Sequence, residues 1–511
     1  MPVVWADEII EIKQEQPVWE IEAKIQHAIN FNNPVIVVGS KTNADQTLTL
    51  ILNFGKTVIW QATYQSNSAF SEFSLITTVG TGTFEVANGT IITANAKAIH
   101  SADVLIIVSG NSKIETSGDE KNAISTYGNV EIKENAQLRS TTGETIATFG
   151  DYATVTVTGG TITATSENAI IAWGNNSKVL VSGGYVGNNA TGYSMVINVK
   201  GSESLVHVSG TAKVEAKRDG EAIFTQGSVI VSGNAQVSNT NGGSQIYIGA
   251  VRASQSVDVK DFAKISALNN YAVCAFNRGI SFSGNSIVEA KENAIAICTE
   301  GPNTISVSDQ AQVIAAQNYA VSCNSTANFT LSVQGGVVFS YGKKITDVIN
   351  YQQFLGPTGT GVVLAWDKQA GNTHYETYSK EDIFVSPATA TAHWEVIGGK
   401  AGIYYANGTN TGFIPLEVSV LSVSEPATAG FEVYPNPTNG ELQVTSYELQ
   451  VNNEKLIMNY IEVFDVYGRK QKSRRAEKQK GEGEVVLDIS HLPAGIYFVK
   501  VGNGVKKVVK L

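Results

Sequence analysis

The sequence predicts an all-β protein built mainly as a right-handed parallel β-helix. Two observations carry this prediction: short Val- and Thr-rich runs lie between Gly and Asn along the chain, and an apolar-x-apolar triplet recurs every 22 to 28 residues. Composition agrees, because only 16% of the 511 residues are charged, too few for a coiled coil or a long-helix protein.

The triplet is usually followed by Ser-Gly and then, five to seven residues after its second apolar residue, by a second apolar strand. That second apolar residue lies at Val86, Val108, Ile132, Val157, Val181, Val208, Val231, Val259, Phe282, Val307 and Val333. A third strand starts with Ala followed by Ile or Val, as at Ala98-Ile99. Three short strands per repeat predict about eleven coils that point Val and Ile inward. A leucine-rich repeat has a similar period, but it needs the LxxLxL pattern and Leu is scarce here.

The β-helix is predicted over residues 34–342, with residues 1–33 as an N-terminal segment that includes a capping helix. In that helix, expected over about residues 18–31, four apolar side chains share one face: Ile21, Ile25, Ala28 and Ile29. A cap is needed because an end coil would otherwise expose apolar surface and strand edges. A helix followed by a strand resembles the N-terminal cap of pectate-lyase-like β-helices.

Beyond the repeats, residues 343–421 are predicted as a small β module and residues 422–430 as a linker. Ile345–Phe354 is a candidate for a short helix that caps the last coil. Several aromatic residues of the module either form its core, which we favour, or stack on a sugar: Trp366, His374, Tyr375, Tyr378, Trp394, Tyr404 and Tyr405.

Outward positions of the coils show no catalytic pattern. The centres of the triplets are Ile107, Glu131, Thr156, Leu180, His207, Ile230, Asp258, Ser281, Ser306 and Ser332. The outward residues of the second strand are Glu115, Arg139, Thr163, Gly187, Glu215, Ser238, Ser266, Glu289 and Ile314. Neither series places two carboxylates on adjacent coils, and His207 and Asp258 are two coils apart. We therefore predict no catalytic residue, no metal site and no cofactor, and we interpret His207 as a solvated surface side chain.

Asparagine and cysteine recur near the third strand. Asn122, Asn168 and Asn293, with Asn270 and Asn318 one residue earlier, are expected in the left-handed conformation at a corner. Cys274, Cys298 and Cys323 fall in successive coils at unequal offsets. They are expected to be small buried hydrophobes, with a disulfide or a reactive thiol as the alternative.

The charge balance is 36 basic against 46 acidic residues, a net charge of −10, which argues against nucleic acid as a partner. No apolar run approaches the roughly 18 residues that a membrane-spanning helix needs. Met1–Ala6 (MPVVWA) is either the stub of an incomplete signal peptide or an ordinary N-terminus.

Residues 431–511 alternate as a small β-sandwich that contains three motifs. Their residues are Pro435, Asn436, Pro437 and Gly440 in the first, Gly468 and Arg469 in the second, and Leu492, Pro493, Gly495 and Tyr497 in the third, before Lys510 and Leu511 at the end. Proline and glycine set the turns at each motif. Arg469–Lys480, with seven basic residues and one acid, is predicted to be a solvated hairpin loop between two strands.

In this order and spacing, the motifs resemble the type A C-terminal sorting domain of type IX secretion cargo in the Bacteroidetes. The resemblance implies Sec export, passage across the outer membrane by the type IX secretion machinery, and removal of the domain by a sortase. It also implies either attachment to an anionic lipopolysaccharide at the cell surface or release from the cell. It does not specify what the cargo does.

Two functions from different classes remain open. The first is a non-catalytic surface protein whose β-helix is a spacer, an adhesive face or a glycan-binding face. The second is a divergent polysaccharide lyase or glycoside hydrolase of the pectate-lyase-like class. Clustered acids and cations on neighbouring coils would favour the enzyme, and the outward positions lack them.

Overall fold

The computed structural model describes residues 8–66, 70, 73–189, 194–217, 220–240, 249–291, 294–299, 304–316, 318–323, 330–341, 353–355, 357–366, 383–397, 400–415, 431–434, 438–446, 450–451, 454–455, 460–465, 469–475, 484–501 and 504–510. These residues are nearly all in β structure, and they divide into two compact units. The first unit holds the described residues up to 366, with 383–393 and 404–413. The second holds 394–397, 400–403 and the described residues from 414 onward.

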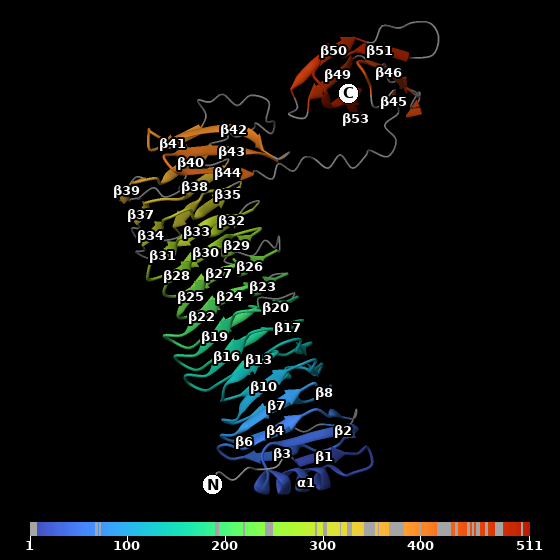
Figure 1. Ribbon diagram of the computed structural model, residues 1–511, viewed down its shortest axis with the longest axis vertical. Coiled ribbons are helices and arrows are strands. Elements are labelled where there is room, and N and C mark those ends of the chain that lie inside the picture. The colour runs from blue at the N-terminus through green and yellow to red at the C-terminus, as the bar shows by residue number, and fades with distance from the viewer. Residues whose placement is uncertain are drawn as a thin grey trace. The chain divides into compact units, whose positions relative to one another are not determined.

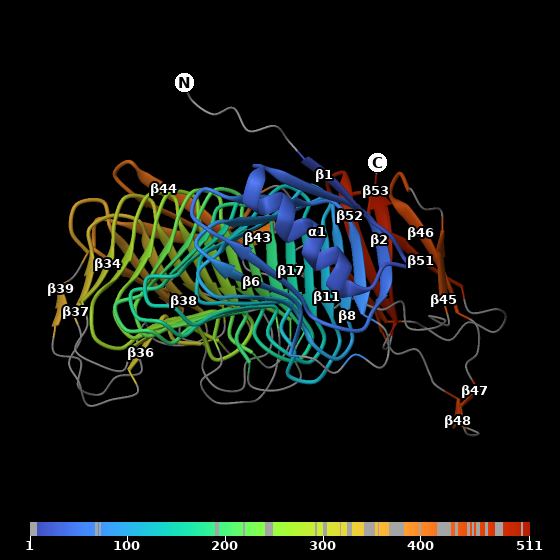
Figure 2. The same cartoon turned by 90° about the horizontal axis from the view of Figure 1, so that it is seen from below.

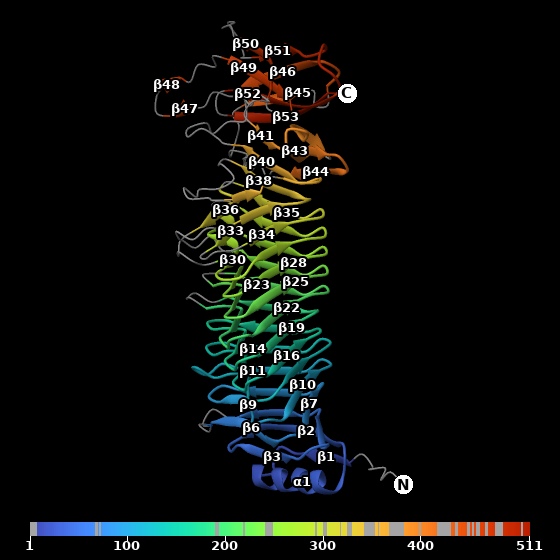
Figure 3. The ribbon, with the colours of Figure 1, turned by 90° about the vertical axis from the view of Figure 1, so that its left-hand side faces the viewer.

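The first unit is a parallel β-helix in which each coil gives one strand to each of three sheets (Figure 1 and Figure 3). The first sheet contains β1 (Glu8–Ile12), β2 (Val35–Ala44), β4 (Thr57–Trp60), β7 (Thr83–Ala87), β10 (Leu105–Ser109), β13 (Val130–Ile132), β16 (Thr154–Val157), β19 (Lys178–Val181), β22 (Leu205–Val208), β25 (Ser228–Val231), β28 (Val257–Val259), β31 (Ile280–Phe282), β34 (Thr304–Val307), β37 (Thr330–Val333) and β39 (Gln353–Leu355).

The second sheet also begins at β2, because this long strand pairs in both. Its other parallel strands are β5 (Thr63–Ser66), β8 (Thr90–Thr93), β11 (Lys113–Thr116), β14 (Gln137–Ser140), β17 (Thr161–Ala164), β20 (Tyr185–Asn188), β23 (Lys213–Ala216), β26 (Gln236–Asn239), β29 (Lys264–Ala267), β32 (Ile287–Ala290), β35 (Gln312–Ala315), β38 (Val337–Tyr341) and β40 (Val362–Trp366).

The third sheet contains β3 (Leu48–Leu52), β6 (Ser74–Gly80), β9 (Lys97–Ser101), β12 (Ile124–Thr126), β15 (Ile146–Thr148), β18 (Ile170–Ala172), β21 (Ile197–Val199), β24 (Ile223–Thr225), β27 (Val251–Ala253), β30 (Tyr271–Ala275), β33 (Ile295–Thr299) and β36 (Val321–Cys323).

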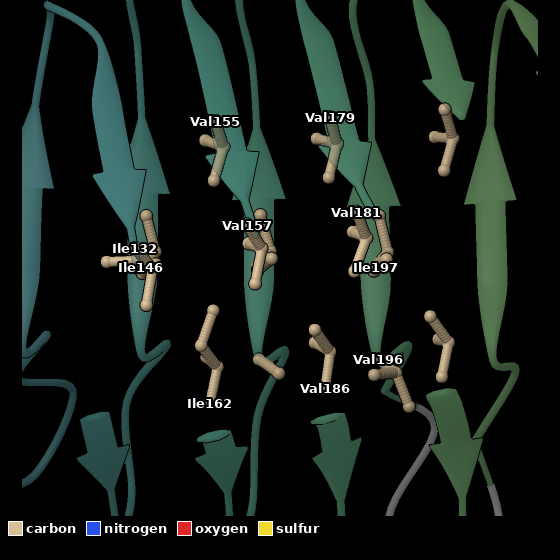
Figure 4. Packing of buried hydrophobic residues seen from close by; sticks show 14 of the residues in the cluster. Ile132, Ile146, Val155, Val157, Ile162, Val179, Val181, Val186, Val196 and Ile197 are labelled. Atoms are coloured by element: carbon tan, nitrogen blue, oxygen red, sulfur yellow. The ribbon is translucent and has the colours of Figure 1, made fainter. Parts of the chain in front are cut away.

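The core lies between the three sheets because apolar side chains alternate with polar ones along each strand. Figure 4 shows this packing, with Val155 and Val157 of one coil beside Val179 and Val181 of the next. The predicted column from Val108 to Val333 is in register on consecutive coils, and each of its members is at most 1% exposed. The predicted inward column is confirmed.

The β-helix has about 13 turns, against the eleven predicted. Additional turns lie at both ends. At the start, Trp60 is in register with Val37 and Val86, so an aromatic residue occupies a position where the repeat pattern expects valine. At the other end, β39 and β40 pair in parallel with β37 and β38, beyond the expected boundary at residue 342.

The helix α1 (Val18–Phe31) packs against β3 and β2 at the start of the β-helix (Figure 2). The predicted face, Ile21, Ile25, Ala28 and Ile29, is buried together with Val18. A strand that we did not predict, β1, precedes the helix and pairs in parallel with β2. Residues 1–7, including the predicted signal-peptide stub, lie outside the described residues.

The last coils are followed by antiparallel strands. β41 (Ile383–Ser386) pairs with β40, and a three-stranded sheet is formed by β42 (Thr391–Ile397), β43 (Lys400–Asn407) and β44 (Asn410–Pro415). Within the first unit, the Asn407 amide donates to the Gly361 carbonyl at 3.0 Å, and the Asn410 amide donates to the Thr360 carbonyl at 2.7 Å. The helix predicted over residues 345–354 is wrong at its end, since residues 353–355 form β39, and its other residues lie outside the described part.

Only one of the predicted asparagines that the structure describes adopts the left-handed conformation, and Asn293 lies outside the described residues. Asn270 adopts it (φ 63°), but Asn122 and Asn168 do not; they are buried, and the Asn168 side-chain oxygen accepts from the Met195 amide at 3.0 Å. The recurrent left-handed residue lies in the turn after the first sheet, at Gly110, Glu134, Gly160, Gly184, Gly210, Gly233, Asp261, Gly284, Asp309 and Gly336. This tight turn needs positive φ on every coil, so the Ser-Gly signature marks it.

The second unit contains two antiparallel sheets. One is formed by β45 (Phe431–Tyr434), β46 (Glu441–Ser446) and β51 (Glu484–Asp488). The other has the order β50 (Lys470–Arg475), β49 (Tyr460–Asp465), β52 (Gly495–Val501) and β53 (Gly504–Lys510). A short hairpin joins β47 (Gln450–Val451) to β48 (Glu454–Lys455). The core includes Leu442, Val444, Ile461, Val463, Leu487, Val499 and Val508.

The predicted sandwich strands are therefore present, but one strand was missed. The basic stretch that we expected to be a loop contains β50, which pairs antiparallel with β49. Lysine and arginine on such an edge strand keep it from pairing with other chains, which explains why an edge strand can resemble a loop in composition.

Candidate functional site

The predicted outward residues lie in two continuous columns. On the first sheet, Glu131 is followed by Thr156, and His207 by Ile230 and then Asp258. On the second sheet, Glu115 is followed by Arg139 and Glu215 by Ser238. The two-coil separation of His207 and Asp258 is confirmed, and neither predicted column places carboxylates on neighbouring coils.

The His207 side chain interacts with neighbouring residues of the β-helix. A ring nitrogen, Nε2, lies 2.9 Å from the Ser232 hydroxyl. Partial burial, with the nearby charge of Lys260, lowers the pKa of His207, so the ring is neutral at physiological pH. Asp258 accepts a hydrogen bond from Ser281. Within the described ranges, no group of three or more His, Cys, Asp and Glu side chains is placed to hold a metal ion.

The structure adds an acidic group that our outward columns did not include. Glu120, Glu144 and Glu167 lie in the turns between the second and third sheets of successive coils. Burial raises the pKa of Glu167, and the negative charges of Glu144 and Glu120 raise it further. A carboxyl with a raised pKa beside another carboxylate is the arrangement that acid–base chemistry uses.

Two of the three cysteines are stacked. Cys274 and Cys298 are in register on the third sheet and are at most 1% exposed, which confirms the prediction that they are buried. Cys323 is in register with Thr299, one position further along the strand. Of the aromatics assigned to the small module, Tyr405 is 2% exposed, and Trp394 lies in β42. His374, Tyr375 and Tyr378 lie outside the described residues.

Four exposed aromatic side chains form what we call the aromatic corner: Tyr127, Phe149, Tyr152 and Trp173. Their exposed fractions are 52%, 37%, 72% and 44%. Three of them directly follow in-register strands of the third sheet, β12, β15 and β18, so they lie on consecutive coils. The ring centroids of Tyr127 and Phe149 are 5.6 Å apart. Large aromatic side chains gathered at the surface mark a binding face more often than isolated ones do.

Glycines allow neighbouring coils to stack closely at this corner. Gly150 and Gly174 follow Phe149 and Trp173, and a Cβ at either position would overlap the backbone carbonyl of the coil before it. The next coil continues with Lys200 and Gly201, and the Lys200 ammonium lies 3.7 Å from the centre of the Trp173 ring. Polar groups border the rings: the backbone amide of Asn175 donates to the Asp151 carboxylate at 2.7 Å, and the Ser202 hydroxyl donates to the side-chain oxygen of Asn175 at 2.8 Å.

The aromatic corner was not predicted, although the sequence contains a signal for it. Tyr127-Gly128, Phe149-Gly150 and Trp173-Gly174 recur at intervals of 22 and 24 residues, which match the coil period. The aromatic-glycine dipeptide lies directly after the third strand of its coil. Outward residues were predicted only for the triplet and for the second strand, so this dipeptide was not considered.

The motifs of the second unit converge on the end of β53. The Thr438 amide donates to the Val509 carbonyl at 2.8 Å, and Thr438 forms a bridge with Lys510. The Thr438 hydroxyl accepts from the Gly440 amide at 3.1 Å. Lys510 also pairs with Gly495 of the third motif. The first motif, the third motif and the last strand therefore meet at one edge of this unit.

Each of the other described motif residues has a local structural role. The Arg469 side chain and backbone amide donate to the Asp465 carboxylate at 2.7 and 3.0 Å, which links the residue before β50 to the last residue of β49. Leu492 and Tyr497 are in the core, and the Tyr497 hydroxyl donates to the Pro493 carbonyl at 2.8 Å. Pro435, Asn436, Pro437, Gly468 and Leu511 lie outside the described residues.

Comparison with known proteins identifies one part of the chain. Residues 432–511 match the family model described as a secretion system C-terminal sorting domain. Comparison with curated proteins and with solved structures gives no match. In the part of the chain that the structure describes, no helix is long and apolar enough to cross a membrane. A sorting domain of this kind implies export by the type IX machinery to the cell surface or the medium. The chain therefore consists of a parallel β-helix followed, at residues 432–511, by a type IX secretion C-terminal sorting domain.

Proposed function

We propose that the β-helix of this exported protein binds glycans outside the cell without cleaving them, as an adhesive or spacer surface. The aromatic corner carries this proposal. Its rings are exposed on consecutive coils about 4.8 Å apart, and an extended glycan advances by a similar length for each sugar. The apolar face of a sugar packs on an aromatic ring, while the bordering Asn175 and Asp151 offer hydrogen-bonding groups.

The proposed export route follows the sorting domain. After Sec export, the type IX machinery takes the cargo across the outer membrane and a sortase removes the sorting domain. The cargo is then linked to an anionic lipopolysaccharide or released. The proposed sorting signal contains the motif residues and the end of β53, and Thr438 contacts both Gly440 and the end of β53.

Affinity electrophoresis of the full chain in gels that contain soluble β-1,4-glucan, β-1,3-glucan or mannan tests glycan binding. We expect retardation by at least one of them. The double variant Tyr127→Ala/Trp173→Ala should weaken that binding about tenfold or more, because each lost stacking contact is worth about 1 kcal/mol. Phe262→Ala, which removes a 62% exposed ring elsewhere on the β-helix, is the control. Migration that none of these glycans changes, or that the double variant leaves unchanged, would contradict the proposal.

The alternative, a divergent polysaccharide lyase or hydrolase, is favoured by one observation: Glu144 and Glu167 lie on adjacent coils, and the pKa of Glu167 is raised. We expect no turnover when the purified protein is incubated with polyuronates and common neutral glycans. Release of reducing ends or unsaturated products that Glu167→Gln abolishes, and that Glu203→Gln does not, would establish the enzyme instead.

A further inference from the structure

The outer face of the second sheet has a hollow next to Gly187 and Tyr185. The outward column here runs Arg139, Thr163, Gly187, Glu215 on four consecutive coils. Gly187 brings no side chain of its own to this column, and the Tyr185 ring lies over its backbone. The hollow beside this ring has a volume of about 220 Å³, and Arg139, Tyr185 and Lys217 are among the residues that line it. This is below the roughly 300–1,000 Å³ of pockets for drug-sized ligands, so it has room for a single sugar unit.

Tyr185 extends over the glycine. A Cβ at residue 187 would overlap the Tyr185 ring, which shows that the ring lies close over the backbone of Gly187. The Tyr185 hydroxyl donates to the Glu215 carboxylate at 3.0 Å, which fixes the ring in this position. Burial and the hydrogen bond to Glu215 raise the pKa of Tyr185, so its phenol stays protonated at physiological pH. The ring provides a fixed aromatic wall for the hollow.

The charges around the hollow are predominantly positive. Glu215 is the one acid of the group, and it is held by Lys213 at 3.0 Å and by Lys217 at 3.7 Å. Arg139 is exposed and, among the described residues, forms no ion pair; Glu115, which precedes it in the column, is bound to Lys113 at 3.0 Å. Arg139 and Lys217 line the hollow, whereas Lys213 and Glu215 do not. No acid is among the described residues that line it, on a chain whose net charge is −10.

We propose that this hollow binds one acidic sugar unit of a glycan, with its carboxylate at Arg139 and its ring against Tyr185. The planar guanidinium matches a carboxylate through two parallel hydrogen bonds, and an exposed, unpaired arginine is free to form them. Lys217 supplies a second positive charge at the rim. The aromatic corner lies at a different edge of the coil, after the third sheet, so this site is independent of the proposed neutral-glycan site.

The test is calorimetric titration of the full chain with three oligosaccharides of equal length: a hexuronate chain, a sulphated chain and a neutral chain. The hexuronate should bind most tightly, and its affinity should fall as salt rises. Arg139→Gln/Lys217→Gln should weaken it about tenfold or more. Arg278→Gln/Lys260→Gln, the same change of charge elsewhere on the β-helix, is the matched control and should leave it unchanged.

The outcomes separate this site from the neutral-glycan site. Hexuronate binding that survives Tyr127→Ala/Trp173→Ala but not the loss of Arg139 and Lys217 supports the inference. Unchanged affinity in the Arg139→Gln/Lys217→Gln variant would overturn the site, and equal binding of the sulphated chain would overturn the assignment of a carboxylate. An unaltered melting temperature in both charge variants shows that the fold is intact, since all four side chains are at the surface.

Discussion

At the scale of single residues, Val208 shows how the β-helix is stabilised. Its side chain is fully buried between Val181 and Val231 of the neighbouring coils. Burying one such side chain contributes roughly 1.5–3 kcal/mol relative to exposing it. The column repeats this apolar contact from coil to coil, so a charged side chain at Val208 would have no polar partner within the column.

We expect Val208→Asp to destabilise the β-helix by more than about 4 kcal/mol, because it buries an unpaired charge between coils. Ser306→Asp, at an outward position of the same sheet, should change the free energy of unfolding by less than about 0.5 kcal/mol. Urea unfolding measured by circular dichroism compares the two. Equal midpoints would show that Val208 does not face the core.

A buried ion pair gives a second prediction at this scale. The Glu221 side chain is fully buried, and its carboxylate lies 2.8 Å from Arg252 Nε and accepts from the Tyr271 hydroxyl at 2.8 Å. Glu221→Gln should cost about 3–5 kcal/mol because it removes the buried charge that balances Arg252. Glu289→Gln, which breaks a partly exposed pair with Lys264, should cost less than about 1 kcal/mol. Similar losses in thermal unfolding would contradict this difference.

At the scale of secondary-structure elements, β53 is the element on which the sorting domain depends. Among the described strands it is an edge strand that pairs along its length with β52 alone, and its end is held by Thr438 from the first motif. Fixing the end of an edge strand in this way protects its backbone from opening and from pairing with other chains.

Thr438→Val should loosen this end of β53. The substitution removes the hydroxyl that accepts from Gly440 and donates to the Glu441 carbonyl at 2.6 Å, a loss of about 1–3 kcal/mol. Hydrogen exchange of the amides in residues 504–510 should accelerate by about tenfold or more. Thr161→Val, at an exposed position of β17, should leave that exchange unchanged. Faster exchange in both variants, or in neither, would show that Thr438 does not hold the strand.

At the scale of the whole molecule, the chain joins two units of different chemistry. Residues 431–511 hold 12 basic and 10 acidic residues, which leaves 24 and 36 in the rest, so the net charge changes from −12 to +2. The second unit has its own core, in which side chains such as Leu442 and Val499 are buried within its two sheets. A domain with its own core is able to act as a separable export signal.

Deleting residues 431–511, or only 506–511, should leave a folded protein in the periplasm of a host that has the type IX machinery. The β-helix should keep its unfolding temperature within a few degrees, because its core is complete without this domain. The domain placed behind a signal peptide and a fluorescent protein should carry that reporter to the cell surface. Fractionation and surface labelling distinguish the outcomes. Surface display of the truncated protein would contradict the assignment.

Local chemistry made much of this protein predictable. The period-2 alternation and the Ser-Gly turns recur within each repeat, so the strands, the inward column from Val108 to Val333 and the capping helix followed from the sequence. The sorting motifs were also visible, because proline and glycine set their turns locally. Such features depend on neighbours only a few residues away, which is why sequence patterns contain them.

Contacts between coils were decided only by the tertiary structure. Coil lengths vary, so the sequence does not show that Cys274 stacks on Cys298, or that the Tyr185 ring lies over Gly187. The same holds for Thr438 and Lys510, which are far apart in sequence and meet across two sheets. The additional turns that contain Trp60 and Leu355 were not predicted, because their residues differ from those that the repeat pattern has in the same register. Trp60 is in register with Val37, and Leu355 is in register with Ser332. Register across coils is set by backbone hydrogen bonds between distant segments, and no local pattern records those bonds.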